Sequence, residues 1–159
     1  MVHRIFIAIN LPESVKNELL AYQNRWPEVP ARWTKPENLH ITLEFIGNVS
    51  DQELEDIKKK TREKVSKQKP FVIKLSRIVY GPLRLRSGQA PRMIWATGDG
   101  HHITLARLRE WEFQKIEPED RPEINEEISF EIPVNSVEIM ESKLKPKGAE
   151  YTIIESIKL

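Results

Sequence analysis

The sequence contains no cysteine, and this absence excludes several kinds of chemistry. Disulfides, thiolate metal sites and cysteine nucleophiles all require that side chain. A chain without cysteine is compatible with a reducing compartment, so we expect a cytoplasmic protein.

Long apolar runs and a strong net charge are also missing. The apolar part of the opening segment MVHRIFIAIN is too short for a signal peptide core or a membrane span, so we expect no membrane association. The net charge is +1 at pH 7, which does not favour the wrapping of a long nucleic acid by bulk electrostatics. Any nucleic acid contact should involve a few phosphates.

Glycine is scarce, at 6 residues, and no low-complexity tract interrupts the chain. Hydrophobic residues make up 39% and charged residues 31%, which is typical of a folded protein. A length of 159 residues favours a single domain over residues 1–159, or two lobes that share one chain.

The pattern of apolar residues predicts an alternation of strands and helices. Helices are expected from Pro12 to Trp26 and from the Ser50 capping box to about Lys67. Strands are expected at the following segments: Arg4–Asn10, Leu39–Ile46, Phe71–Tyr80, Arg92–Thr97, His102–Leu108, Ile128–Leu144 and Glu150–Leu159. The turn-prone Gly98-Asp99-Gly100 should join two of these strands in an antiparallel hairpin. The fold class is therefore α+β.

The tetrapeptide His-Ile-Thr-Leu occurs twice, starting at His40 and at His102, each time in a predicted strand. Side chains two residues apart share a face of a strand, so each histidine should point with its threonine, Thr42 or Thr104. The apolar members are expected to be buried behind them: Ile41, Leu43, Ile103 and Leu105.

Two imidazoles and two hydroxyls suit phosphodiester hydrolysis. Such a reaction needs a base for the attacking water, an acid for the leaving alkoxide and donors for the non-bridging oxygens. Histidine can take either proton-transfer role near neutral pH. Hydroxyls and a nearby arginine can stabilise the phosphoryl charge without a metal.

The paired motifs, with RIFIAIN, HITLEFIG and HITLAR around them, resemble the 2H phosphoesterases, and most of all the RNA 2',3'-cyclic phosphodiesterases, also called 2'-5' RNA ligases. The resemblance implies two lobes of antiparallel sheet with flanking helices, related by a pseudo-twofold axis. It implies an RNA with a 2',3'-cyclic phosphate end as the substrate, no cofactor or metal, and no obligate protein partner, so we expect a monomer.

The resemblance also implies residue roles. His40 would be the proton donor and His102 the proton acceptor that activates water. Arg107 occupies the position of a phosphate-binding arginine, and Phe45 a position associated with base stacking. Strict alternation places both residues on the face opposite to the histidines, so reaching the site requires a bulge or an early strand end.

One departure from the family concerns the second half of the chain. The family places a helix between the strand RMIWAT and the strand that begins at His102, whereas here only Gly98 to His101 lie between them. A natural deletion, an engineered loop and a helix supplied by a partner all remain open.

Other polar and aromatic residues are expected to be structural. We interpret His101 as an exposed turn residue, His3 as a terminal surface residue and Trp33 as a packed side chain. Glu44 should share the face of His40, but no clustered ligand motif supports a metal there. Basic side chains that could rim the site and guide RNA are Arg84, Arg86, Arg92, Lys143, Lys145 and Lys147.

Three other functions compete with cyclic phosphate hydrolysis. The same histidines would serve the reverse reaction, 2'-5' ligation of such an end to a 5'-hydroxyl. A non-catalytic module that binds RNA ends is an alternative, and a phosphodiesterase for a small cyclic nucleotide is another.

Overall fold

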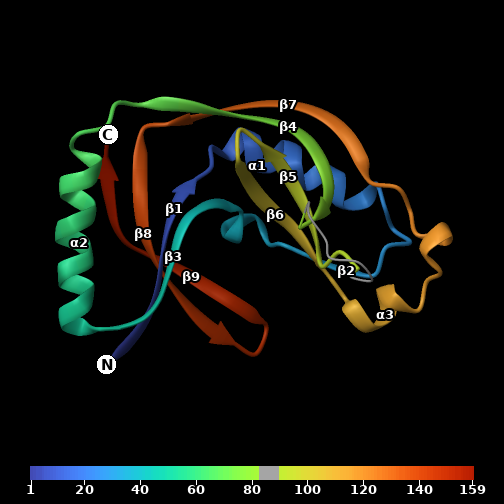
Figure 1. Cartoon of the computed structure of the whole chain (residues 1–159), viewed down its shortest axis with the longest axis horizontal. Coiled ribbons are helices and arrows are strands. Elements are labelled where there is room, and N and C mark those ends of the chain that lie inside the picture. Colours follow the sequence, from blue (N-terminus) through green and yellow to red (C-terminus); the bar gives the residue numbers. More distant parts are fainter. Residues whose placement is uncertain (83–89) are drawn as a thin grey trace. The chain divides into compact units, whose positions relative to one another are not determined.

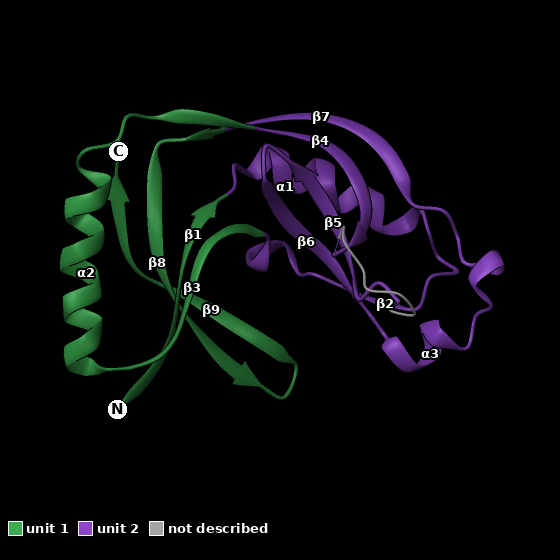
Figure 2. Ribbon diagram, viewed as in Figure 1, with its two compact units in different colours: residues 1–10, 40–73, 133–159 green, residues 11–39, 74–132 purple. Residues whose placement is uncertain are grey.

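The computed structural model describes residues 1–82 and 90–159, and antiparallel strands dominate it (Figure 1). The predicted α+β class is therefore confirmed. The chain divides into two compact units (Figure 2). Unit 1 comprises Met1–Asn10, His40–Ile73 and Pro133–Leu159, and unit 2 comprises Leu11–Leu39 and Lys74–Ile132.

Unit 1 is an antiparallel sheet with the strand order β3-β1-β8-β9. Its strands are β1 (Val2–Asn10), β3 (His40–Ser50), β8 (Ser136–Lys145) and β9 (Gly148–Lys158). The helix α2 (Asp51–Val65) also belongs to this unit. The predicted capping box begins it, because Ser50 Oγ accepts the Glu53 N–H at 3.2 Å and Glu53 Oε1 accepts the Ser50 N–H at 3.1 Å.

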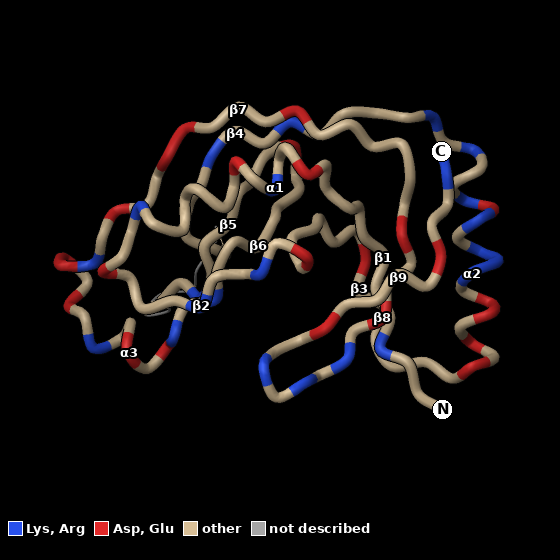
Figure 3. Tube along the Cα trace, turned by 180° about the vertical axis from the view of Figure 1, so that it is seen from behind, with Lys and Arg blue, Asp and Glu red and all other residues tan. Residues whose placement is uncertain are grey.

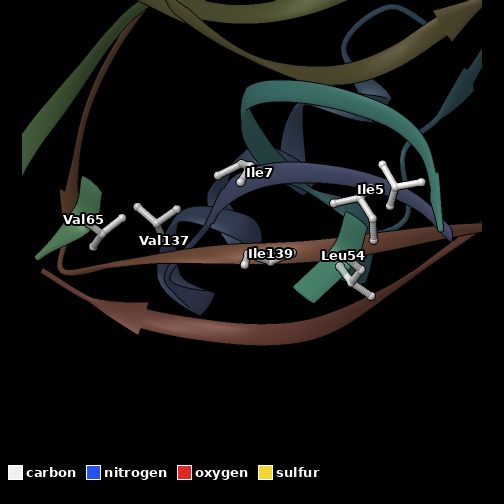
Figure 4. Packing of buried hydrophobic residues seen from close by; sticks show 7 residues of the cluster. Ile5, Ile7, Leu54, Val65, Val137 and Ile139 are labelled. Atoms are coloured by element: carbon white, nitrogen blue, oxygen red, sulfur yellow. The ribbon is translucent and has the colours of Figure 1, made fainter. Parts of the chain in front are cut away.

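Both faces of β1 carry buried residues. Alternation sends Ile5 and Ile7 to the face that α2 covers, where they pack with Leu54 and Val65 of the helix (Figure 4). The neighbouring Phe6 and Ala8 form a separate buried cluster with Met140, against which Tyr151 packs. The short apolar run predicted as a strand is thus buried from both sides.

Unit 2 is a second antiparallel arrangement, with the order β7-β4-β5-β6 and β2 paired to β6. Its strands are β2 (Ala31–Trp33), most of β4 (Phe71–Gly81), β5 (Met93–Gly98), β6 (His101–Leu108) and most of β7 (Asn125–Val134). The helix α1 (Glu13–Leu20), the 3-10 turns η1 (Ala21–Asn24), η2 (Pro36–Asn38) and η3 (Pro118–Asp120), and the short helix α3 (Glu110–Gln114) complete the unit.

The predicted hairpin joins β5 to β6 through Asp99 and Gly100. Both residues have positive φ, 51° and 75°, which is the requirement of a tight type I′ turn. Asp99 Oδ2 also accepts the N–H of Lys74, at 2.8 Å. All residues between β5 and β6 are described, and no helix lies there.

Several element boundaries differ from the sequence predictions. The first helix ends at Leu20 and continues only as a 3-10 turn to Asn24. β2 lies between the first predicted helix and the strand predicted at Leu39, where no strand was expected. β3 continues past Gly47, because this glycine adopts a φ of 95° and the pairing with β1 resumes beyond it. The segment expected as one strand, Ile128–Leu144, is two strands separated at Asn135. None of the described helices is both long and apolar enough to span a membrane.

Candidate active site

His40 begins β3, and its strand contains an irregularity immediately after the threonine of the motif. The pairing of β1 with β3 runs from Ala8 opposite Thr42 to Ile7 opposite Glu44, so that Leu43 is the extra residue of a β-bulge. Residues directly opposite each other in a ladder share a face. Phe45 lies opposite Phe6, and therefore returns to the face that carries His40 and Thr42. A regular strand would place Phe45 on the opposite face, so this bulge is what brings Phe45 onto the face of His40.

The bulge also corrects two predictions about neighbouring residues. Leu43 was expected to be buried, but its side chain is 38% exposed. Glu44 was expected to share the face of His40, but its partner Ile7 belongs to the face covered by α2. Leu43 and Glu44 instead line a cavity of about 710 Å³ beside that helix. Among the described residues, no group of three His, Asp or Glu side chains could hold a metal ion.

The His40 imidazole lies in a polar and aromatic setting. Its Nε2 atom is 2.8 Å from Thr42 Oγ1. The Thr42 hydroxyl can donate to a neutral imidazole, and a protonated Nε2–H can donate to the hydroxyl. The ring centroids of Phe6 and Tyr151 lie 5.1 Å and 5.3 Å from that of His40. The rings of Phe6 from β1 and Tyr151 from β9 therefore limit the orientations of this imidazole.

Phe45 is an exposed aromatic on the same face. Its side chain is 56% exposed, although the Arg4 guanidinium lies 5.2 Å from its ring centroid. An exposed aromatic ring offers an apolar face on which a planar ligand can stack. Its geometry is suited to stacking.

His102 lies in β6, and the same irregularity follows its threonine. Trp95 lies opposite Thr104 and Ile94 opposite Ala106, so that Leu105 is the extra residue. Leu105 and Ala106 are both buried, and the exposed Arg107 consequently returns to the face of His102 and Thr104. The two copies of the tetrapeptide share both their sequence and the position of their bulge.

Thr34 holds the backbone at this second bulge. Its N–H donates to the Leu105 carbonyl at 2.8 Å, and its hydroxyl donates to the Thr104 carbonyl at 2.9 Å. Pairing with β2 follows directly, with Arg32 opposite Arg107. β2 and the adjoining Thr34 therefore support the part of β6 that carries Arg107.

Trp95 of β5 provides the environment of the His102 ring. The two rings are stacked, with centroids 3.9 Å apart and planes inclined by 15°. The indole lies against the backbone of Gly81, where a Cβ atom would approach the ring to 2.4 Å. Burial, with a smaller contribution from the charge of His101, lowers the pKa of His102 below its ordinary value. A neutral imidazole is thereby favoured near neutral pH.

The remaining predicted residues have varied outcomes. The interpretation of His101 as an exposed turn residue is wrong, because His101 is the first residue of β6 and is partly buried. Its Nδ1–H donates to the Asp99 carbonyl at 2.9 Å. Trp33 packs as predicted, stacked on Trp26 with centroids 6.4 Å apart. The interpretation of His3 as a plain surface residue is wrong, because its ring bridges Asp51 and Glu141.

The predicted basic residues are only partly covered by the structure. Lys143, Lys145 and Lys147 occupy the exposed end of the β8–β9 hairpin, where Figure 3 shows a group of basic positions. Arg92 is exposed just before β5. Arg84 and Arg86 lie outside the described residues.

Sequence reasoning missed Phe6, Tyr151 and Trp95 as neighbours of the histidines. Each lies on a strand other than that of the histidine it contacts. The alternation of β1 and β5 could have indicated the faces of Phe6 and Trp95, but their partner strands depend on pairing between distant segments. No signal in the sequence points to Tyr151.

Each unit carries a histidine and a threonine on one face of a strand, followed by the same bulge, and these two pairs are the candidate phosphoesterase residues. Residues 9–95 match the sequence model of the LigT like Phosphoesterase family. Because this match spans more than half of the chain, the protein belongs to that family, the 2H phosphoesterases. The matched region includes the first motif and ends at Trp95, before the hairpin that leads to the second motif.

Curated relatives match nearly the whole chain. The RNA 2',3'-cyclic phosphodiesterase of Methanocaldococcus jannaschii is 26% identical over 179 aligned positions, which cover 96% of this chain and 98% of the relative. The protein of the same name from Thermus thermophilus is 29% identical over 191 positions, which cover 98% of this chain and 90% of the relative. Both alignments are longer than the chain of 159 residues, so this chain is shorter in places than these relatives.

Solved structures agree with this assignment. A crystal structure of a Thermus thermophilus protein has a TM-score of 0.81 at 26% identity and covers 98% of this chain and 97% of its own. The structure of E. coli LigT complexed with 3'-AMP has a TM-score of 0.73 at 19% identity and covers 100% of this chain and 99% of its own. This second likeness concerns the fold alone.

Proposed function

We propose that the protein hydrolyses the 2',3'-cyclic phosphate at the end of an RNA strand to a 2'-phosphomonoester, without a metal ion, by acid–base catalysis from His40 and His102. The observation that carries the proposal is the duplicated tetrapeptide, which has the same bulge in β3 and in β6. The curated relatives that bear the name RNA 2',3'-cyclic phosphodiesterase support the substrate class.

In the proposed reaction, a water oxygen attacks phosphorus and the bond from phosphorus to the 3' oxygen breaks. His102 accepts a proton from the water, and His40 donates a proton to the departing 3' oxygen, so the products are a 2'-phosphomonoester and a 3'-hydroxyl. The lowered pKa of His102 supports its role as the acceptor, because a base must be neutral to act. The hydrogen bond between Thr42 and His40 supports a donor held in one orientation.

The phosphate and the base would be held by residues on the two histidine faces. Thr42, Thr104 and Arg107 would donate hydrogen bonds to phosphate oxygens, with the Arg107 charge stabilising the transition state. Phe45 would stack on a base of the RNA, for which its exposed ring supplies the surface.

The test uses EDTA-treated wild type, His40→Ala and His102→Ala with a short RNA that ends in a 2',3'-cyclic phosphate, and resolves 2'- from 3'-phosphate products. We expect a 2'-phosphate from the wild type, and a loss of at least about a hundredfold in each variant, since general acid–base catalysis contributes 10²–10⁴-fold. A metal requirement, a 3'-phosphate product or an active His40→Ala variant would contradict the proposal.

The alternatives give different results in the same assay. RNA binding without turnover by the wild type would favour a module that binds RNA ends. Equal rates for an oligonucleotide and for a nucleoside 2',3'-cyclic monophosphate would favour a small-nucleotide phosphodiesterase. Ligation requires a second RNA with a 5'-hydroxyl, and we propose it as the reverse direction of the same chemistry.

A further inference from the structure

Two arginines face each other across the pairing of β2 with β6. Arg32 lies directly opposite Arg107 in the register, and both side chains are exposed. Opposite residues of neighbouring strands share a face, with their Cβ atoms about 4.5–5.5 Å apart. Arg32 therefore joins His102, Thr104 and Arg107 on one face of unit 2. Figure 3 shows basic positions at β2.

No carboxylate of the described residues neutralises this pair of like charges. Two other arginines of unit 2 have carboxylate partners, Arg25 with Glu126 at 2.8 Å and Arg109 with Glu112 at 3.9 Å. Within residues 1–82 and 90–159, neither Arg32 nor Arg107 has an ion pair or a side-chain hydrogen bond. Like charges directly opposite in a sheet are destabilising, and an anion bound beside them removes that cost. Guanidinium groups bind phosphate oxygens in a bidentate manner, so phosphate is the anion they suit best.

The position of Arg32 separates it from the reacting centre. Arg107 is about 13 Å along the strand from His102, and Arg32 lies one strand further, on the side of β6 away from β5. The His102 ring points the other way, because it stacks on Trp95 of β5. A phosphate that is hydrogen-bonded to His102 is therefore closer to Arg107 than to Arg32.

We propose that Arg32 binds an internal phosphate of the RNA strand, next to the cyclic phosphate that Arg107 contacts. The proposal rests on the function proposed above and adds a specificity for chain length. The two guanidiniums take two neighbouring phosphates of one strand, so that each phosphate compensates one of the two positive charges. A nucleoside 2',3'-cyclic monophosphate has a single phosphate and leaves Arg32 without a ligand.

The experiment compares Arg32→Gln and Arg32→Lys with the wild type on two substrates, a trinucleotide ending in a 2',3'-cyclic phosphate and a nucleoside 2',3'-cyclic monophosphate. Arg32→Gln should lower kcat/KM for the trinucleotide roughly tenfold, the lower end of the value of a hydrogen bond to a charged group. Its kcat/KM for the nucleoside should not change. Arg32→Lys keeps the charge and should give a smaller loss on the trinucleotide. Arg109→Gln, an arginine of the same unit that pairs with Glu112, is the matched control and should behave as the wild type.

Binding provides a second readout that does not depend on turnover. The affinity for a fluorescent trinucleotide ending in a 2'-phosphate is measured at several salt concentrations. Loss of one phosphate contact should reduce the slope of log K against log[salt] by about 0.7 in Arg32→Gln, whereas Arg32→Lys should keep the slope. If the wild type turned over no substrate, the proposed function would fail, and this comparison would still decide the role of Arg32.

Three outcomes would overturn the inference. An equal loss on the nucleoside and on the trinucleotide would assign Arg32 to the terminal phosphate. An unchanged kcat/KM and an unchanged salt slope in Arg32→Gln would show that Arg32 does not bind a phosphate of the RNA. A lower melting temperature would indicate a structural arginine, whereas relief of repulsion predicts an equal or higher melting temperature.

Discussion

At the scale of single residues, the two identical tetrapeptides place their imidazoles in different environments. His40 is hydrogen-bonded to Thr42 and flanked by Phe6 and Tyr151, whereas His102 is stacked on Trp95. The neighbours that create this difference come from strands outside the motifs. A site that needs an acid and a base can obtain both from one repeated sequence in this way.

Replacement of Trp95 should change the pH dependence of the reaction. In the wild type, the lowered pKa of His102 keeps the imidazole neutral to lower pH than an ordinary histidine, so the acid limb of the kcat/KM profile should lie below about pH 6.5. Trp95→Leu admits water to the ring and should move that limb upward. NMR titration of His102 in the resting protein should show the same upward shift.

A matched control for this substitution is Trp111→Leu, because Trp111 is largely exposed on α3. Its pH profile should coincide with that of the wild type. Coincident profiles for Trp95→Leu and the wild type would show that the stack does not control the titration of His102.

At the scale of structural elements, the bulge decides which residues can act together. An extra residue after each threonine brings Phe45 and Arg107 onto the faces of the histidines, which regular strands would not do. The second bulge depends on Thr34, whose N–H and hydroxyl bind two successive carbonyls of β6.

Thr34→Val should weaken this support while preserving the shape of the side chain. Loss of the hydroxyl removes one hydrogen bond, which costs about 1 kcal/mol of unfolding free energy. Because Arg107 and Thr104 adjoin the bulge, kcat/KM should also fall several-fold, at a temperature where the variant is fully folded. Urea denaturation and steady-state kinetics measure the two effects.

Ser50→Ala is the control for a loss of stability without a loss of function. It removes the capping box of α2 and should cost about 1 kcal/mol of unfolding free energy. Its kcat/KM should remain that of the wild type. A Thr34→Val variant with unchanged kcat/KM would mean that β6 keeps its bulge without the hydrogen bond from the Thr34 hydroxyl.

At the scale of the whole molecule, stability should depend on pH through an ion-pair cluster in unit 1. His3 of β1 bridges Asp51, the first residue of α2, and Glu141 of β8. The hydrogen bond to Asp51, followed by that to Glu141, raises the pKa of His3 above its ordinary value. The hydrogen bond from His3 lowers the pKa of Asp51.

The directions of these pKa shifts define the pH range in which the cluster stabilises the folded protein. The contribution of His3 is complete below its unfolded pKa of about 6.5 and is lost as the pH rises through its higher folded pKa. The contribution of Asp51 is present above its unfolded pKa of about 3.9 and is lost on acidification. His3→Gln should therefore lower the free energy of unfolding most near pH 5.5 and least near pH 9, as measured by urea denaturation.

Arg62→Gln serves as the comparison, because it breaks the pair of Arg62 with Glu155 in the same unit. Neither group titrates between pH 5.5 and 9, since the pKa of Glu155 is lowered and that of Arg62 is raised. Its cost should be the same at both pH values. An equally constant cost for His3→Gln would exclude a charged His3 in the folded protein.

The amino-acid sequence by itself determined the α+β class, the capping box of α2 and the hairpin at Asp99-Gly100. It also determined that each histidine shares a strand face with the threonine two residues on. These features follow from periodicity, side-chain capping and turn chemistry, all of which act over a few residues. Only the tertiary structure decided the faces of Phe45, Glu44 and Arg107, the aromatic neighbours of the histidines and the position of Arg32 opposite Arg107. These depend on strand register, and a shift of one residue moves a side chain to the other face of the sheet.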